Sequence, residues 1–323
     1  MHITAKKIAQ LAGVTPTTVS YVLKDSKKVS AATKERVRKI MKKLDYYPNL
    51  SGRSLKQGRT NAIAVLSTYF HGLFKMEFMN GVESAAIDTP YRLSQFYTKR
   101  GDDNSKLKEI LLGRMADAVI ALSLRPGAAF LRKMRASSNH IVLVDDVVSG
   151  FSGISFDNFR AAYIAVEYLI KQGRKNIALA TVDPEIQGLY ENISERIRGY
   201  KAALDGSNLP YNERLIIRIK DYSVQQGRYA FTSLSPKKTK CDAILCASGD
   251  LTAAGFMKEA SEKGVKIPDD IAVIGFDDSI AAAITTPSLT SVRQPAFDIG
   301  RAAVSYTHLR AHETVLDLVC RLL

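Results

Sequence analysis

The sequence predicts an α/β protein whose core is two lobes of doubly wound parallel sheet, preceded by an all-α helix-turn-helix domain. From about residue 61 onward, apolar strand-like segments alternate with helix-like segments, which is typical of parallel sheets covered by helices on both faces. About eleven or twelve strands are more than one such sheet usually holds, so we expect two similar lobes. The first sixty residues differ from the rest, with short helical stripes and concentrated positive charge.

Three short helices are expected in this N-terminal part. A first helical stripe stops at Gly13, and a second covers residues 15–23, where Thr15 is suited to cap the helix and Pro16 to occupy its first turn. A third stripe covers about residues 30–44. Two short helices joined by a turn with glycine form a helix-turn-helix, whose second helix can lie in a DNA major groove. The pattern alone leaves an ordinary helical hairpin as an equal alternative.

The distribution of charge favours the DNA-binding interpretation. Residues 1–60 hold 14 Lys and Arg against 3 Asp and Glu, a net charge of +11 out of +14 for the whole chain. The remaining 263 residues therefore carry only +3. Basic charge concentrated beside a helix-turn-helix is the electrostatic signature of phosphate-backbone binding, whereas a solvated basic face on a small bundle is the less favoured alternative.

Composition excludes several other classes of protein. A length of 323 residues suggests two or three domains, and no apolar run approaches the roughly 20 residues of a membrane span. The opening MHITAKK has no hydrophobic signal region, so we expect a cytoplasmic protein. Cys241, Cys246 and Cys320 have no metal-ligand spacing and are expected to be reduced thiols. His308 and His312 share a helix face without a third ligand, so no metal site is expected.

The alternation in the core sets the expected elements. Strands are expected, from compact apolar runs, at residues 62–67, 91–98, 118–124, 141–144, 177–181, 215–219, 243–246 and 271–276. Helices are expected between them, around residues 76–86, 105–112, 128–134, 159–171, 194–204, 224–234 and 251–263. The basic segment 49–59 contains two glycines and has little to bury, so by itself it is interpreted as a linker.

Charged residues follow several of these strands. Asp145 and Asp146 come after the strand at 141–144, Asp277 and Asp278 follow the one at 271–276, and Arg196 lies near the start of a later helix. Doubly wound sheets bind ligands beyond the carboxyl ends of their strands, so these side chains are candidates for binding the hydroxyls, amides or acidic group of a small ligand. The alternative is that each aspartate pair merely caps the following helix.

Motifs for catalysis are missing. The sequence has no G-x-G-x-x-G after its first core strand, no GxxxxGK[ST] and no G-x-S-x-G, so an enzyme is a weak hypothesis and no cofactor is expected. A sugar-binding or transport protein with the same two-lobed core is a second alternative. The missing signal region and the basic N-terminal part speak against that alternative.

Seven segments together carry a resemblance to a known family: IAQLAGVTPTTVSYVL, KVSAATKERVRKIMKKLDYYPN, RSLKQGRT, SERIRGYKAAL, GDLTAAGF, IPDDIAVIGFDD and PSLTSVRQP. On these, the chain resembles the LacI family of bacterial transcriptional regulators over nearly its whole length. The resemblance implies a helix-turn-helix headpiece at 1–48, a hinge at 49–60 and a periplasmic-binding-protein-like core at 61–323. Within the core it implies an N-lobe of about 61–160 plus 293–323 and a C-lobe of about 161–292, joined by three crossovers.

The resemblance also implies a function. The expected protein is a sequence-specific regulator, most simply a repressor, that binds a palindromic double-stranded operator as a homodimer and is not an enzyme. A small-molecule effector, a sugar or another small polar metabolite, would bind between the lobes and shift the protein between states of different DNA affinity. The expected location is the cytoplasm, associated with the nucleoid and not with a membrane.

The family pattern assigns DNA contacts residue by residue. Base reading would fall to Pro16, Thr17 and Tyr21, where many relatives have an arginine in place of Tyr21. Contacts nearer the DNA backbone would come from Thr15, Thr18, Ser20, Ser30, Thr33, Tyr46 and Asn49. In the hinge, residues 49–56 would form a helix only on operator DNA, with Leu55 wedged into the minor groove and Arg53 beside it. Gly52 replaces the usual alanine there, which should make this helix harder to form.

Effector contacts of the family correspond to Phe74, Asp145, Arg196 and Asp277. Phe74 would stack or pack against the ligand. Gly249 stands where relatives often have asparagine, so one amide contact to the effector is missing from this chain.

The C-terminal end departs from the family pattern. After residue 304 the family continues its helix into one more strand, whereas SYTHLRAHETVLDLVCRLL follows here. We expect this tail to lack that strand and interpret it as a sequencing, assembly or cloning scar.

Overall fold

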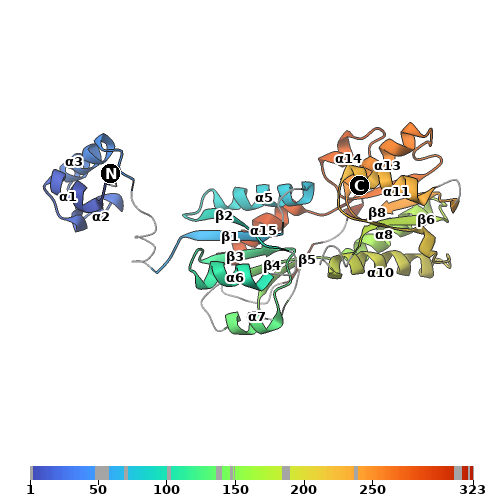
Figure 1. Cartoon of the computed structure of the whole chain (residues 1–323), viewed down its shortest axis with the longest axis horizontal. Coiled ribbons are helices and arrows are strands. Elements are labelled where there is room, and N and C mark those ends of the chain that lie inside the picture. The colour runs from blue at the N-terminus through green and yellow to red at the C-terminus, as the bar shows by residue number, and fades with distance from the viewer. Residues whose placement is uncertain are drawn as a thin grey trace. The chain divides into compact units, whose positions relative to one another are not determined.

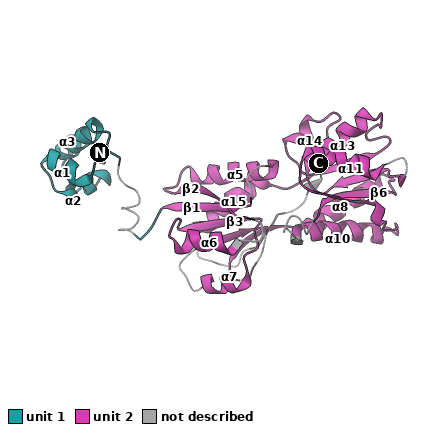
Figure 2. Ribbon diagram, viewed as in Figure 1, with its two compact units in different colours: residues 1–60 teal, residues 61–323 magenta. Residues whose placement is uncertain are grey.

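A computed structural model of the chain describes residues 3–47, 58–68, 72–99, 103–135, 140–145, 148, 150–183, 190–235, 239–308, 315–318 and 321–322. The chain forms two compact units, residues 1–60 and residues 61–323 (Figure 2). No described helix is long and apolar enough to cross a membrane.

Unit 1 is a small three-helix bundle of α1 (Ala5–Ala12), α2 (Pro16–Leu23) and α3 (Ala31–Lys43). Each helix begins after a hydroxyl residue, Thr4, Thr15 or Ser30, whose side chain accepts an N–H from three residues further on. Gly13 ends α1 with a φ of 61°, a left-handed conformation that glycine adopts without strain. The helices pack around a core listed here by its buried members: Ile8, Ala9, Ala12, Val19, Val22 and Val37.

Unit 2 contains two six-stranded sheets. The first has the order β11-β5-β4-β3-β1-β2, with all pairs parallel. Its strands are β1 (Ala62–Ser67), β2 (Arg92–Tyr97), β3 (Ala118–Leu122), β4 (His140–Val144), β5 (Ser152–Phe156) and β11 (Val315–Leu318). The helices α5 (Leu73–Ala86), α6 (Asp103–Leu112), α7 (Ala128–Arg135) and α15 (Ala296–His308) cover this sheet (Figure 1).

The second sheet has the order β12-β10-β9-β8-β6-β7, in which only β12 runs antiparallel to its neighbour. Its strands are β6 (Ile177–Val182), β7 (Ile216–Ile219), β8 (Ala243–Cys246), β9 (Ala272–Asp277), β10 (Thr290–Arg293) and β12 (Arg321–Leu322). Five helices belong to this lobe: α8 (Asn158–Lys171), α10 (Tyr190–Gly206), α11 (Val224–Leu234), α13 (Asp250–Glu262) and α14 (Ile280–Ile284); a short 3₁₀ helix, η1 (Glu213–Leu215), precedes β7.

Glycines allow close helix packing in both lobes. A Cβ atom on Gly81 of α5 would overlap the Phe297 carbonyl of α15, and one on Gly300 would overlap the Phe78 carbonyl. The same reciprocal arrangement joins Gly255 of α13 to α11. Since α5 and α15 lie far apart in the sequence, this contact anchors the returning chain to the first lobe.

Between described strands the chain passes from one sheet to the other three times: from β5 to β6, from β10 to β11 and from β11 to β12. Each change of sheet places a connection between the lobes. The segment 293–323 is therefore not entirely in the first lobe, as we expected, because β12 pairs with β10 of the second sheet.

Two expectations about strands were wrong. The sequence analysis did not predict β5, whose SGISF sequence is too short and polar to stand out, although four of its five residues are buried. It also expected the C-terminal tail to lack a strand, whereas Val315–Leu318 forms β11 parallel to β5. Strand pairing uses main-chain groups, so a tail that differs from the family in sequence can still add a strand.

Candidate functional site

Unit 1 exposes the N-terminal half of α2. Thr15, Pro16, Thr17 and Ser20 are exposed, because the buried side of this helix is formed by Val19 and Val22, and Tyr21 is half-buried. The Lys28 ammonium lies 5.8 Å from the centre of the Tyr21 ring, which adds a cation beside the phenol.

Several other predicted DNA-contacting residues are also engaged within the bundle. Thr15 and Thr18 hydroxyls lie 3.0 Å apart, and the Ser30 hydroxyl donates to Thr33 Oγ1 at 3.0 Å. Tyr46 packs against the bundle core and is half-buried. Asn49, Arg53 and Leu55 of the expected hinge lie outside the described residues.

The turn after α2 is fixed by charge. Asp25 has a φ of 50° and accepts ion pairs from Lys34 at 3.0 Å and from Arg38 at 2.7 Å. Its hydrogen bonds and charge interactions with these two cations lower the pKa of Asp25. Asp25 thus ties the turn to α3, and most of the basic residues around it keep no acidic neighbour in sequence.

Unit 2 contains a cavity of about 600 Å³ at the carboxyl ends of strands from both sheets. The four predicted effector contacts Phe74, Asp145, Arg196 and Asp277 all line it. Phe74 comes from the first turn of α5, Asp145 follows β4, and Asp277 ends β9. The topology brings these residues together because parallel strands in each lobe end on the same side.

Arg196 on α10 is held from three sides. Its Nε donates to Asn158 Oδ1 at 2.7 Å, one terminal nitrogen donates to the Ala247 carbonyl at 2.6 Å, and the guanidinium lies 3.8 Å from the centre of the Phe276 ring. Asn158 is itself buried and donates to the Phe156 carbonyl at 3.0 Å. The guanidinium is therefore presented to the cavity in one orientation.

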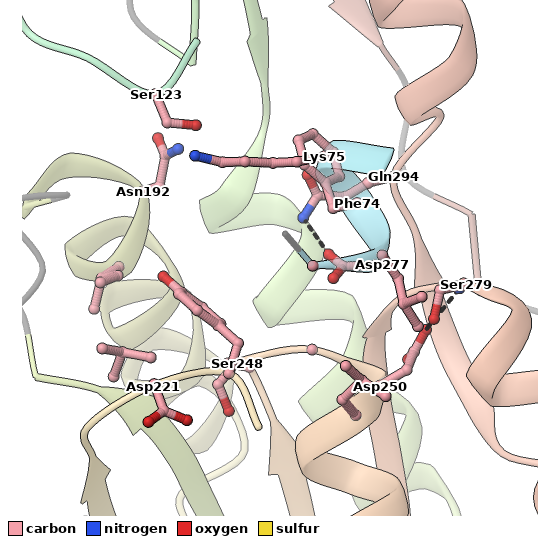
Figure 3. Close-up of a pocket in the computed structure, with 18 of the residues that line it drawn as sticks. Phe74, Lys75, Ser123, Asn192, Asp221, Ser248, Asp250, Asp277, Ser279 and Gln294 are labelled. Atoms are coloured by element: carbon pink, nitrogen blue, oxygen red, sulfur yellow. Dashed lines mark hydrogen bonds between the residues drawn. The ribbon is translucent and has the colours of Figure 1, made fainter. Parts of the chain in front are cut away.

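Asp277 faces Gln294 and Gly249. Gln294 donates from Nε2 to Asp277 Oδ1 at 3.0 Å (Figure 3), and the backbone of Asp277 has a φ of 103°. Burial raises the pKa of Asp277 to about 8, an effect that the Arg196 charge partly offsets. At neutral pH this carboxyl group is therefore mostly protonated and can donate as well as accept a hydrogen bond.

Asp145 lies in the half of the cavity formed by the first lobe. Its Oδ2 accepts a hydrogen bond from the Ser123 hydroxyl at 2.6 Å. Burial raises the pKa of Asp145, while Ser123 and the charges of Lys75 and Arg196 act in the opposite direction. Neither Asp145 nor Asp277 caps a helix, so the capping alternative does not describe these two residues. Asp146 lies outside the described residues, and Asp278 forms an ion pair with Arg293.

The sequence analysis missed Lys75, Asn192, Asp250 and Gln294, which also line the cavity (Figure 3). Asp250 is buried and accepts hydrogen bonds from the Ser279 amide, the Ser279 hydroxyl and the Ser291 hydroxyl. Lys75 stands in the first turn of the helix after β1, a position that itself indicates the carboxyl end of a sheet. Gln294 directly follows β10, a strand the analysis did not predict.

The described residues offer no set of three His, Cys, Asp or Glu side chains placed to hold a metal ion. Cys241 and Cys246 are buried free thiols whose pKa is raised by burial, so neither is an activated nucleophile.

Comparison with known proteins agrees with this arrangement. Residues 4–49 match the family model "Bacterial regulatory proteins, lacI family", and residues 166–315 match "Periplasmic binding protein-like domain". The chain is 34% identical over 307 residues to the HTH-type transcriptional regulator RegA of Clostridium acetobutylicum, covering 93% of this chain and 90% of that protein. It is 31% identical over 310 residues to the HTH-type transcriptional repressor PurR of Vibrio atlanticus, covering 93% and 89%.

Solved structures are similar over the whole chain. A complex of the transcriptional regulator CelR with cellobiose has a TM-score of 0.70 at 27% identity, covering 99% of this chain and 98% of that one. The Lac repressor dimer bound to operator and the anti-inducer ONPF has a TM-score of 0.84, covering 100% and 98%. At 22% identity, the second comparison concerns the fold alone.

Proposed function

The chain belongs to the LacI family of DNA-binding transcriptional regulators, which are not enzymes, and from this premise we propose that it is a repressor that binds a palindromic operator as a homodimer. A sugar or related small polar metabolite in the cavity of unit 2 controls its affinity for DNA.

The observation that carries this proposal is the exposed start of α2 within a strongly basic unit. Pro16, Thr17 and Tyr21 reach base edges, while Thr15, Thr18, Ser20, Ser30, Thr33, Tyr46 and Asn49 contact the DNA backbone. Two features support this assignment: the capped α2 presents short polar side chains, and 14 of the chain's basic residues lie in residues 1–60. Arg53 and Leu55 contact the minor groove from the hinge.

Dimerisation is supported by apolar side chains that the first lobe leaves exposed. Met76 and Ile87 on and beside α5 are 55% and 79% exposed, and Tyr97 on the edge strand β2 is 60% exposed. Large apolar groups gathered on neighbouring elements are typical of an interface. A two-fold dimer presents two α2 helices and therefore requires a palindromic operator.

Effector control rests on the cavity. Phe74 packs against the ligand, Arg196 donates hydrogen bonds to it, and Asp145 and Asp277 bind its polar groups. Each lobe contributes some of these residues, so a ligand that binds them all favours one relative position of the lobes over another. Only the difference between its affinities for the two states changes DNA binding.

Selection of binding sites from a pool of random duplexes tests the proposal. The full chain should enrich sequences with two-fold symmetry, and Tyr21→Ala should weaken binding to the enriched site while Tyr168→Ala, at an exposed tyrosine of α8 in unit 2, should not. Enrichment of unsymmetrical sites would contradict the dimeric proposal. No enrichment above the starting pool would contradict sequence-specific regulation itself.

A further inference from the structure

The cavity of unit 2 contains a buried lysine. Lys75, in the first turn of α5, is only 5% exposed, and yet it lines the cavity. Its Nζ donates to the Ser67 hydroxyl at 2.6 Å, and Ser67 in turn donates to the Leu122 carbonyl at 3.2 Å. Removing an ammonium group from water is costly unless a negative charge or several hydrogen bonds compensate for it. A lysine is therefore an expensive residue to keep at this position.

A charge partner inside the protein does not fully explain Lys75. Asp145 is the carboxylate whose pKa Lys75 affects, but the two side chains do not form an ion pair. Asp145 instead accepts from the Ser123 hydroxyl at 2.6 Å. Lys75 thus acts on Asp145 only over a longer distance, and its ammonium group extends along the cavity wall toward Ser123 and Asn192 (Figure 3).

The remaining charges in the cavity leave its interior favourable to an anion. Arg196 is a second cation there. Asp250 has its carboxylate occupied by three hydrogen bonds from Ser279 and Ser291. Burial raises the pKa of each of the three buried carboxyl groups, Asp145, Asp250 and Asp277, which reduces their negative charge near neutral pH. Asp221, the fourth acid in the lining, is exposed.

An uncommitted amide lies at the same end of the cavity. Asn192 on α10 comes from the second lobe, and no hydrogen bond joins its side chain to another residue in the described part of the chain. A ligand group between Lys75 and Asn192 would therefore contact one residue from each lobe. An amide N–H and an ammonium are both donors, which suits an oxygen-rich anionic group.

From this geometry we propose that the effector carries a carboxylate or phosphate group, which binds to Lys75 and Asn192 at the junction of the two lobes. The inference rests on the proposed effector role of the cavity and names the chemical class of the ligand. The rest of the ligand lies toward Phe74, Arg196 and Asp277. A neutral compound with the same skeleton binds more weakly, because it leaves the buried ammonium without an anionic partner.

Thermal unfolding of the full chain with simple anions tests this inference. Inorganic phosphate and acetate are titrated separately at constant ionic strength, with chloride as the reference. A ligand that binds only the folded state raises Tm saturably, by about 4 °C at ten times its dissociation constant. We expect such a rise with at least one of the two anions, and which one acts distinguishes a phosphate from a carboxylate.

Variants locate the effect. Lys75→Met, which keeps the length of the side chain without its charge, should abolish the rise. Lys108→Met, at an exposed position of α6 in the same lobe, should keep it. Lys75→Gln is a second neutral variant in case the first does not fold. An equal rise in the Lys75 variants, as expected from anions bound to the basic unit 1, would overturn the inference. So would the lack of a saturable rise in the unmodified chain.

DNA binding separates this inference from the proposed function. A chain that binds its selected duplex but shows no anion effect at Lys75 overturns only the anionic effector. A chain that shows the effect at Lys75 but binds no DNA overturns only the regulator.

Discussion

Gly249 lies against the carboxylate of Asp277: a Cβ atom on Gly249 would be 3.0 Å from Asp277 Oδ2. Gly249 also has a φ of 105° and a ψ of 167°, a backbone region that is essentially restricted to glycine. The sequence departs from the family pattern at this position, and the structure gives the departure a local role. The missing side chain leaves room beside a cavity carboxyl group.

We therefore predict that Gly249→Ala lowers the free energy of unfolding by about 2–3 kcal/mol, from backbone strain together with the contact to Asp277. Gly264→Ala is a matched control, since Gly264 has a φ of 70° and no atom within 4 Å of its Cβ position. It should cost about 1 kcal/mol. Urea unfolding of both variants measures the difference, and equal costs would show that Asp277 does not restrict this position.

The raised pKa of Asp277 predicts a dependence of stability on pH. The folded protein holds a proton on Asp277 up to a pH of about 8, whereas the unfolded chain loses it near the ordinary value of 3.8. The contribution of this group to stability is therefore complete below pH 4 and is lost as the pH rises toward 8. The slope is at most about 1.4 kcal/mol per pH unit, because Asp277 remains partly exposed to the cavity.

Asp277→Asn should remove this dependence. Unfolding free energies of both proteins between pH 5 and pH 8 measure the effect, and the advantage of the asparagine variant should grow as the pH rises. A constant difference across that range would mean that Asp277 is ionised throughout.

Arg196 provides a test of orientation in the cavity. Arg196→Lys keeps the charge but loses the fork that reaches both Asn158 and the Ala247 carbonyl, so we predict a loss of about 2 kcal/mol in the free energy of unfolding. Arg198→Lys on the same helix is the control, because Arg198 is 66% exposed and its ion pair with Glu195 contributes little. Similar losses from both variants, measured by urea unfolding, would argue against a fixed guanidinium.

The hinge gives a prediction that rests on helix propensity alone, since Gly52 lies outside the described residues. If residues 49–56 become helical on operator DNA, Gly52→Ala should favour the bound form by about 0.5–1 kcal/mol per subunit. Titration of the selected duplex should show tighter binding with no change on unrelated DNA. Unchanged or weaker binding to the selected duplex would contradict a helical hinge.

How far the sequence predicts this protein depends on the type of signal. The start of α2 could be predicted because Thr15 and Pro16 act locally, through a cap and a fixed φ. The strand-end acids Asp145 and Asp277 could be predicted because parallel topology determines where strand ends lie. Both signals need only neighbouring residues or a repeated pattern.

The remaining features depend on contacts between distant segments. β5 has no apolar run, and only its pairing with β4 and β11 makes it a strand. Lys75 stands in a helical stretch where a lysine is ordinarily solvated, and nothing nearby in the sequence shows that it lies inside a cavity. Gln294 reaches Asp277 only because β10 lies next to β9. Such partners follow from the assembled fold rather than from local pattern.

The most direct measurement of the central claim is the salt dependence of DNA binding by the full chain, compared with residues 61–323 alone. If the basic unit 1 binds the duplex, log affinity of the full chain should fall steeply and linearly with log salt, by about 0.9 per phosphate contacted, and the shorter chain should not bind. An affinity that is independent of salt, or equal binding by residues 61–323, would contradict the account.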